Sequence, residues 1–296
     1  MFKAVNRYIL PFLFVGVGFF SFPVKAWSYV GSVIYLYNGP GTSEESVLHT
    51  EFTIRTLVDQ KYKITKIGPV EVARGEWVQN AAMFIIPGGA DIPYSKHLKL
   101  GGNQQIKSYV EKGGAFLGFC AGAYYGSAKV EFALHTPLEV VGLRELSFFP
   151  GKAIGPTLAD YDYKSASGAR AAEIRWDSLT GSIPKNKNFL VYYNGGGHFE
   201  NVSLYKNVTT LAWYGSSSKN KAAIVEVSVG KGKVILSGVH CEYSPYLLNK
   251  KDPFLAPIQK KLLSKEKERT VLMTHLLERL NIKVRKQEFL KEATNG

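Results

Sequence analysis

The stretch GGAFLGFCAGAYYGS, residues 113–127, constrains the fold of this chain more than any other part of the sequence. AFLGF is a short apolar run typical of a buried strand, and Cys120 follows it directly, flanked by Gly118 and Gly122. This spacing is typical of a nucleophile elbow, in which small residues let a strand turn sharply into a helix and present the central side chain. A helix N-terminus also favours a thiolate. The alternative is a small buried cysteine at a glycine-rich junction.

Strand and helix patterns alternate around this stretch. The expected strands are residues 30–37, 61–68, 81–87 and 115–119, and the expected helices are residues 44–60, 102–114 and 121–132. This alternation predicts an α/β fold of three layers, with helices flanking a mostly parallel sheet. Later segments indicate added β-hairpins and one more helix: strands over 144–156, 188–201, 208–215 and 222–238, and a helix over 265–280.

A nucleophilic cysteine needs a base and a group that orients the base. In KVILSGVHCEYSP, His240 and Glu242 alternate about Cys241, so on an extended segment their side chains face the same way. A neighbouring carboxylate holds an imidazole in one tautomer and keeps it basic. His198 in GGGHFE is a weaker candidate base. We therefore predict a catalytic triad of Cys120, His240 and Glu242, and no disulfide between Cys120 and Cys241, whose side chain points away.

A second glycine turn follows the strand AAMFIIP. Gly88 and Gly89 can direct backbone N–H groups towards an oxyanion, and the N–H of Ala121 is the natural second donor, so Gly89 and Ala121 are the predicted oxyanion hole. An ordinary turn is the alternative. Gly88 is also a candidate for substrate binding, together with residues near the predicted strand ends: Asn38, Asp91, Tyr94, Tyr124 and Arg144. No metal and no cofactor are predicted.

The N-terminus carries an export pattern. Lys3 and Arg7 precede the apolar run ILPFLFVGVGFFSF, and Val24 and Ala26 occupy the small-residue positions typical of a cleavage site. We expect a signal peptide over residues 1–26 and a periplasmic or secreted protein, with an uncleaved anchor as the alternative. The main domain is then expected over residues 27–250.

Basic residues are concentrated near the C-terminus. The net charge is +13, and residues 247–296 hold 12 Lys or Arg against 6 Asp or Glu. We expect residues 251–296 to form a basic helical extension with solvated faces, and weak contact with an anionic envelope or membrane surface is one use of such a tail. Nucleic acid is not an expected partner, because the sequence contains no recognisable nucleic-acid-binding module.

The elbow, the His-x-Glu pair and the glycine turn together resemble the class I glutamine amidotransferases, which have a Cys-His-Glu triad. More specifically, the chain resembles the N-terminal domain of eukaryotic biotin-protein ligases and its stand-alone bacterial relatives, from about Ser32 to Ser244. The matching stretches are YNGPGTS, PGGADIPY, GFCAGAYYGSAKVEF, RELSFFPG, the GAR of SGARA, YYNGGG and GKGKVILSGVHCEY. The resemblance implies a flavodoxin-like, class I glutamine amidotransferase-like fold with the triad named above, and with Gly89 and Ala121 at the oxyanion position.

The chain departs from this pattern at three points. Tyr124 stands where glutaminase elbows usually carry glutamine or methionine, which argues against glutamine as the substrate. Cys241 replaces the usual proline between the histidine and the glutamate. No biotin-ligase domain or adenylate loop follows the triad, which argues against biotin ligation by this chain.

Export favours simple hydrolysis, because ATP for a coupled synthetase is scarce outside the cytoplasm. The sequence therefore predicts a cysteine amidohydrolase that acts on a small-molecule or peptide-like amide. The alternative is a non-catalytic ligand-binding or scaffold module that keeps the elbow. Thiol reactivity separates the two, because a triad cysteine reacts fast at neutral pH.

Overall fold

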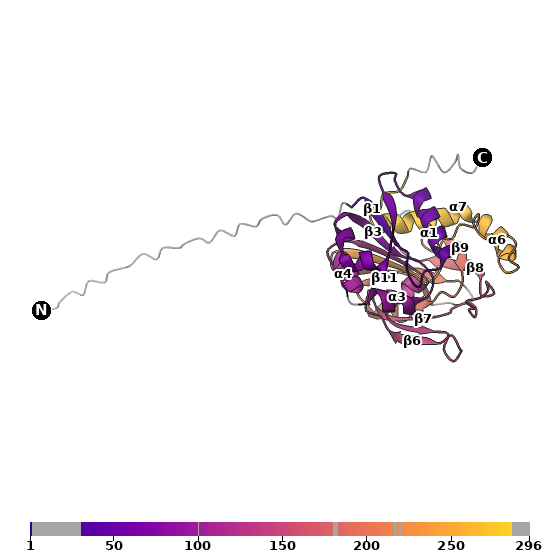
Figure 1. Cartoon of the computed structure of the whole chain (residues 1–296), viewed down its shortest axis with the longest axis horizontal. Helices are drawn as coiled ribbons and strands as arrows, with labels where there is room; N and C mark the ends of the chain where they lie inside the picture. Colours follow the sequence, from indigo (N-terminus) through magenta and orange to yellow (C-terminus); the bar gives the residue numbers. More distant parts are fainter. Residues whose placement is uncertain (2–30, 100, 180–182, 216–217, 219–220, 286–296) are drawn as a thin grey trace.

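The computed structural model describes residues 1, 31–99, 101–179, 183–215, 218 and 221–285 (Figure 1). The expected signal peptide lies outside this part of the chain. Among the residues described, no helix is both long enough and apolar enough to cross a membrane.

Five parallel strands form one half of the sheet, in the order β2-β1-β3-β4-β13. They are β1 (Val33–Tyr37), β2 (Lys63–Ile67), β3 (Ala81–Ile86), β4 (Ala115–Phe119) and β13 (Gly232–Ser237). The four strands predicted in the first 120 residues are thus present. Strand order reverses between β1 and β3, and in open α/β sheets ligands bind beyond the carboxyl ends of strands at such a reversal.

Helices cover both faces of these strands, as an α/β chain requires. On one face lie α1 (Glu44–Leu57) and α7 (Glu266–Arg279), and on the other lie α2 (Pro69–Arg74), α3 (Asp91–Leu98) and α4 (Gly101–Glu111). Side chains of β3 alternate between the two cores: Ile85 faces the α1 and α7 side, whereas Phe84 and Ile86 face the other. The predicted three-layer α/β fold is confirmed.

The second half of the sheet is mostly antiparallel and contains the added hairpins. It continues from β13 through β12 (Ala222–Val229), β10 (His198–Phe199), β7 (Phe149–Gly155), β5 (Ser127–Phe132) and β6 (Val140–Leu143). A branch off β12 holds β11 (Val208–Tyr214), β8 (Arg170–Trp176) and β9 (Asn188–Tyr193). Two short 3-10 turns span Glu76–Asn80 and Val202–Leu204. β12 and β13 form the hairpin predicted from the GKG turn.

The helix after Cys120 is shorter than expected. It spans only Ala121–Tyr125 (α5), and β5 begins at Ser127 after Gly126. The expectation of a helix through residue 132 is wrong, because the Ser127–Phe132 segment instead pairs with β6 and β7. Val130 and Phe132 on this strand are buried. The alternation of buried and less buried side chains in this segment follows the period of a strand.

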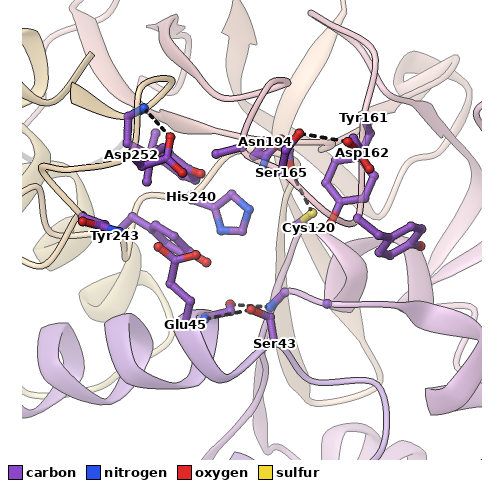
Figure 2. A pocket seen from close by; sticks show the side chains of 18 of the residues that line it. Ser43, Glu45, Cys120, Tyr161, Asp162, Ser165, Asn194, His240, Tyr243 and Asp252 are labelled. Carbon is purple, nitrogen blue, oxygen red and sulfur yellow. Dashed lines mark hydrogen bonds between the residues drawn. The ribbon is translucent and has the colours of Figure 1, made fainter. Parts of the chain in front are cut away.

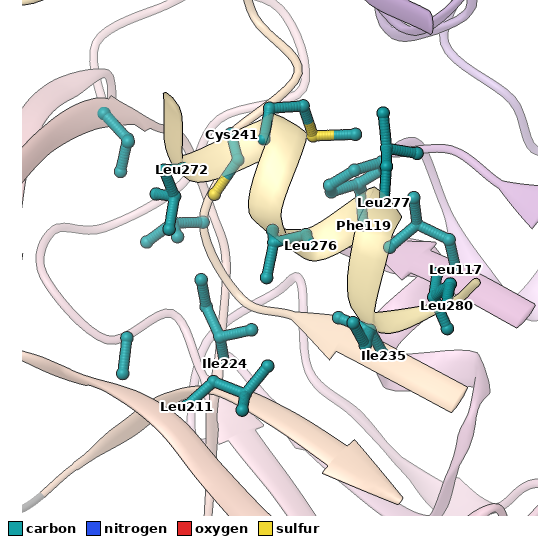
Figure 3. Close-up of a cluster of buried hydrophobic side chains, with 14 of the residues drawn as sticks. Leu117, Phe119, Leu211, Ile224, Ile235, Cys241, Leu272, Leu276, Leu277 and Leu280 are labelled. Carbon is teal, nitrogen blue, oxygen red and sulfur yellow. The ribbon is translucent and has the colours of Figure 1, made fainter. Parts of the chain in front are cut away.

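The C-terminal helices pack on the same body. Helix α6 (Ala256–Leu263) covers a small cluster that includes Leu248 and Leu255. Helix α7 inserts Leu272, Leu276 and Leu277 into the core beside β4 and β13, as Figure 3 shows. The expected C-terminal extension is therefore continuous with the core over its described part. Its last residues, 286–296, lie outside that part.

Candidate active site

The turn after β4 holds Cys120 in a strained conformation. Its φ is 47° and its ψ is −105°, a combination that L-residues seldom adopt. The Cys120 N–H donates to the carbonyl of Ser237 at 2.9 Å, which fixes the elbow against β13. The flanking glycines are required by space: a Cβ on Gly122 would lie 2.1 Å from the carbonyl oxygen of Ile86, and one on Gly118 would lie 2.7 Å from that of Gly122. The chain can make this tight turn because Gly118 and Gly122 have no side chains.

The loop after β13 brings the predicted base and carboxylate to this elbow. His240 Nδ1 donates to Glu242 Oε1 at 2.7 Å, and both side chains are buried. The backbone of His240 is held by its N–H bond to the carbonyl of Tyr192 at 2.9 Å. The hydroxyl of Thr53 on α1 donates to the carbonyl of Glu242 at 2.7 Å. Figure 2 shows the imidazole turned towards Cys120, with the ring facing the cavity.

The histidine of this group is strongly basic. Burial alone would lower the pKa of His240, but the charge of Glu242 and the hydrogen bonds with Cys120 and Glu242 outweigh it and raise the pKa to about 10. The imidazole is therefore protonated at neutral pH. Because Nδ1 is engaged by Glu242, Nε2 is the nitrogen that can exchange a proton at the cysteine.

Aromatic rings hold the imidazole in place. Tyr192 and Tyr243 stack in parallel with centroids 4.6 Å apart, and the His240 ring lies 4.5 Å from that of Tyr243. His49 of α1 stacks on the other side of the system, 4.0 Å from the Tyr243 ring. These rings leave His240 little freedom to rotate away from Cys120, as a positioned general base requires.

The glycine turn after β3 lies beside the elbow, as predicted. The N–H of Gly88 donates a hydrogen bond to Ser46 Oγ at 2.7 Å. The hydroxyl of Tyr94 donates to the carbonyls of Pro87 and Gly88 at 3.1 and 3.2 Å. Gly89 has φ of 150°, which only glycine adopts readily. No protein acceptor is found for the Gly89 or Ala121 N–H among the residues that the structure describes. These two donors can therefore serve an oxyanion.

A cavity of about 410 Å³ opens above Cys120 and His240 (Figure 2). Its walls come from the start of α1, the glycine turn, the loop over residues 161–166, the end of β9 and the segment leading into α6. The Cys120 thiol lies 3.7 Å from the carbonyl oxygen of Asn194 at the cavity edge. A smaller hollow of about 20 Å³ also adjoins Cys120, and its lining includes Ala121, Tyr124 and Asp91. The larger cavity is big enough for a small ligand and borders both Cys120 and His240.

The candidate substrate-binding residues fall into different places. Gly88 lines the large cavity, and Asp91 and Tyr124 line the small hollow. Tyr124 is buried and donates to the carbonyl of Gly195 at 3.1 Å, so it closes the floor of the hollow. Asn38 is exposed at the end of β1 and lines neither space, which corrects its expected role. Tyr94 is also corrected, because it lies behind the glycine turn and holds the backbone of that turn.

Arg144 does not line either space but pairs with Asp91. Its Nε and Nη2 both lie 2.7 Å from Asp91 Oδ2, and both residues are buried. Burial raises the pKa of Asp91, opposed by the charge of Arg144 and its hydrogen bond. The pair supports the wall of the small hollow from behind.

The other histidine and cysteine candidates lie apart from this site. His198 sits on β10 with Nδ1 3.1 Å from the Thr157 hydroxyl, and burial lowers its pKa to about 4. Cys241 points into the core beside Leu272, and burial raises the pKa of its thiol (Figure 3). Both cysteines are free, in agreement with the prediction of no disulfide between them.

Sequence reasoning missed several residues of the cavity wall. They are Glu45, Ser46, Tyr161, Tyr192, Asn194, Tyr243 and Asp252. Three of them carry a signal, because Tyr192 and Asn194 lie in YYNGGG and Tyr243 ends HCEY, two stretches that carry the family resemblance. Glu45 and Asp252 have no such signal: each resembles an ordinary acidic residue near a helix start. Only the packing of α1 and the α6 segment against the sheet brings them to the cavity.

Comparison with known proteins gives a consistent family. The sequence model of the family described as "Biotin-protein ligase, N terminal" matches residues 32–295. The chain is 36% identical over 258 residues to a biotin-protein ligase of Schizosaccharomyces pombe, covering 86% of this chain and 38% of the ligase. It is 35% identical over 218 residues to an uncharacterized protein of Chlamydia muridarum, covering 72% of this chain and 81% of that protein.

Solved structures that align with this chain share much less sequence identity with it than these relatives do. PurLQS from Thermotoga maritima aligns with 12% identity and a TM-score of 0.49, covering 83% of this chain and 98% of that chain. A Bacteroides uniformis protein described as putative ThuA-like aligns with 12% identity and a TM-score of 0.45, covering 84% of this chain and 95% of that chain.

Proposed function

The chain belongs to the biotin-protein ligase N-terminal family, and from this premise we propose that it is a cysteine amidohydrolase that cleaves a small amide or peptide-like bond. The matched region spans only 38% of the Schizosaccharomyces pombe ligase. The activity in that protein's name therefore belongs to a longer protein and is not carried over to this chain. The proposal concerns the chemistry that the shared domain itself can carry out.

One observation carries this proposal. Cys120 sits at a strained elbow next to an imidazole that is hydrogen-bonded to a buried carboxylate, and this group faces a cavity. A structural cysteine needs none of these features, and strain of this kind collects at functional sites. A scaffold module also has no need for a buried His240–Glu242 pair, because the desolvation cost of burying two charges can exceed the attraction between them.

The proposed reaction proceeds in two steps. The Cys120 thiolate attacks the amide carbon, and the N–H groups of Gly89 and Ala121 stabilise the oxyanion. The C–N bond breaks as His240 gives its proton to the leaving amine, which leaves a thioester on Cys120. Water then loses a proton to His240 and attacks the thioester, which releases a carboxylic acid and restores the Cys120 thiolate beside the protonated imidazole. Glu242 keeps the imidazole oriented throughout.

We place this reaction outside the cytoplasm, on the export pattern of the N-terminus. Hydrolysis needs only water, so it suits a compartment with little ATP. The same reasoning disfavours an amidotransferase role, in which released ammonia is passed to an ATP-dependent synthetase.

The test is to follow acylation of Cys120 by p-nitrophenyl acetate. We expect steady release of p-nitrophenol and an acetyl group on Cys120, visible by peptide mass spectrometry. Cys120→Ser and Cys120→Ala should both lose turnover, with Cys120→Ser retaining the fold because serine is nearly isosteric. His240→Ala should lower the rate by several orders of magnitude, roughly 10³-fold or more.

A binding module would behave differently. Its Cys120 would remain unacetylated, or would acetylate at the rate of a free thiol, and the His240→Ala variant would match the wild type. Either result would contradict the proposed function.

A further inference from the structure

The cavity above Cys120 carries an excess of negative charge, although the chain as a whole is strongly basic. Its charged lining consists of the carboxylates Glu45, Asp162 and Asp252 against Lys164 and His240, and the positive charge of His240 is balanced behind the wall by Glu242. The net charge of the whole chain is +13. A negative cavity in a positive protein selects for ligands of positive charge.

Two of the three carboxylates accept hydrogen bonds from neighbouring groups of the chain. Asp162 accepts from the backbone N–H of Lys164 at 2.9 Å and from the Ser165 hydroxyl at 2.9 Å. Asp252 Oδ1 caps the turn into α6, accepting from the N–H groups of residues 254 and 255 at 2.8 and 3.1 Å. These four hydrogen bonds fix loop conformations at the cavity rim.

Glu45 differs from these two. Within the described part of the chain, its carboxylate has no hydrogen-bond donor, and the nearest ring nitrogen, His49 Nε2, is 3.9 Å away. That histidine cannot balance the charge, because burial lowers its pKa to about 3 and leaves it neutral at physiological pH. Desolvation and the charge of Asp252 raise the pKa of Glu45, while the charge of His240 lowers it. Glu45 is thus a cavity-facing carboxylate near the His240 imidazolium, which is already paired with Glu242, and among the described residues Glu45 has no charged ion-pair partner of its own.

The surroundings of Glu45 suit an organic cation. The stacked rings of Tyr192 and Tyr243 line the same cavity, and Figure 2 shows the Glu45 carboxylate directed towards Tyr243 and His240. A carboxylate beside aromatic rings is a favourable environment for an ammonium group, through both ionic and cation–π attraction.

Resting on the proposed hydrolase function, we propose that the substrate is an amide that carries a positively charged group, and that Glu45 binds this group. The carboxylates at the rim disfavour a substrate that also carries an exposed carboxylate. Glu45 is therefore the specificity-determining residue of the site, whereas Cys120 and His240 act on the amide carbon.

The experiment compares three iodoacetamides that share one reactive group and differ in side arm: a trimethylammonium arm, a neutral hydroxyl arm and a sulfonate arm. The alkylation rate of Cys120 is measured for each by peptide mass spectrometry and divided by the rate of the same reagent with the neutral thiol N-acetylcysteine amide. The normalised rate of the cationic reagent is then divided by that of the anionic reagent, and the intrinsic reactivity of the Cys120 thiol cancels in this ratio. Glu45→Gln is the test variant, and Glu44→Gln, on the same helical turn but not in the cavity wall, is its matched control.

We expect the wild type to favour the cationic over the anionic reagent by about tenfold or more, because the two reagents differ by two charges in the same field. Glu45→Gln should reduce this ratio about tenfold, and Glu44→Gln should leave it unchanged. A wild-type ratio near one, or a ratio that Glu45→Gln does not change, overturns the inference. The proposed function fails separately, if Cys120 reacts with the neutral reagent no faster than the reference thiol, because the charge ratio can still be read in that case.

Discussion

Replacing Glu242 by glutamine should leave the His240 imidazole mostly uncharged at neutral pH. Glu242 is fully buried, and its carboxylate is 2.7 Å from Nδ1 of His240. Its charge is the strongest of the influences that raise the pKa of His240. Glutamine keeps the size and one acceptor oxygen but removes the charge, so burial should then dominate and lower the pKa of His240.

The size of the effect follows from the shift. The pKa of His240 is raised from 6.5 to about 10. At about 1.4 kcal/mol per pKa unit, this difference corresponds to about 5 kcal/mol in favour of the protonated imidazole in the folded state. Because the pKa in the folded state is above that in the unfolded state, this stabilisation is fully present below pH 6.5. It is lost as the pH rises from 6.5 through 10.

Two measurements follow the change. Nuclear magnetic resonance of the histidine ring protons should show one wild-type ring that stays protonated at pH 8, assigned by its absence in His240→Gln. In Glu242→Gln the same ring should titrate at about 6.5 or below. His49 and His198, with pKa values lowered to about 3 and about 4, stay neutral throughout this range. Urea denaturation between pH 6 and 10 then measures the difference in free energy of unfolding between the two proteins, which should be largest near pH 6 and shrink towards pH 10.

The control is Glu226→Gln, which breaks an ion pair with Arg279 at 2.7 Å. Arginine keeps its charge over this pH range, so the free-energy difference from the wild type should not change with pH. A Glu242→Gln difference that is equally constant, or a wild-type His240 ring that titrates near pH 6.5, would refute the reasoning.

Three further predictions concern the surroundings of the proposed triad. Gly122→Ala should prevent normal folding, because the new Cβ would lie 2.1 Å from the backbone oxygen of Ile86, and the yield of soluble protein and its melting temperature report this. Arg144→Met should destabilise the fold by about 3–5 kcal/mol in urea denaturation, because it leaves Asp91 buried without its cation. Cys241→Ala should cost about 1–2 kcal/mol by removing a buried core side chain, and it should leave the alkylation rate of Cys120 unchanged.

Each of these has a matched comparison. Gly101→Ala, where the nearest atom to a new Cβ is 3.7 Å away, should be tolerated, and equal behaviour of the two glycine variants would contradict the steric argument. Adding Asp91→Asn to Arg144→Met should recover much of the lost stability, and no recovery would show that the charge of Asp91 is not the cause. A changed Cys120 rate in Cys241→Ala would show that the two thiols are coupled.

The parallel half of the fold could be predicted from the sequence because its signals are local. Continuous apolar runs such as Ala81–Ile86 indicate strands buried on both faces, and the glycines after them mark turns. The end of α5 could not be found in this way. Residues 121–132 are compatible with a helix locally, and only pairing with the two later strands β6 and β7 makes Ser127–Phe132 extended.

In the candidate site, too, the residues marked by local sequence patterns could be predicted, and those placed by long-range packing could not. Cys120, His240 and Glu242 are recognisable because the elbow and the His-x-Glu alternation are short-range patterns. Glu45 and Asn38 show what such patterns cannot supply. Both are exposed residues near turns early in the chain, but Glu45 on α1 lines the cavity and Asn38, directly after β1, does not.

The most direct test of the central claim is the rate at which iodoacetamide modifies Cys120 at pH 7, with Cys241 as the internal reference in the same molecule. Cys241 is buried in the core and should stay unmodified in the folded protein. If His240 activates Cys120, the wild-type rate should exceed that of a free thiol, which has a pKa of about 8.5, by about tenfold or more, and His240→Ala should lose this excess. A Cys120 that reacts like a free thiol, at the same rate in His240→Ala, would contradict the account.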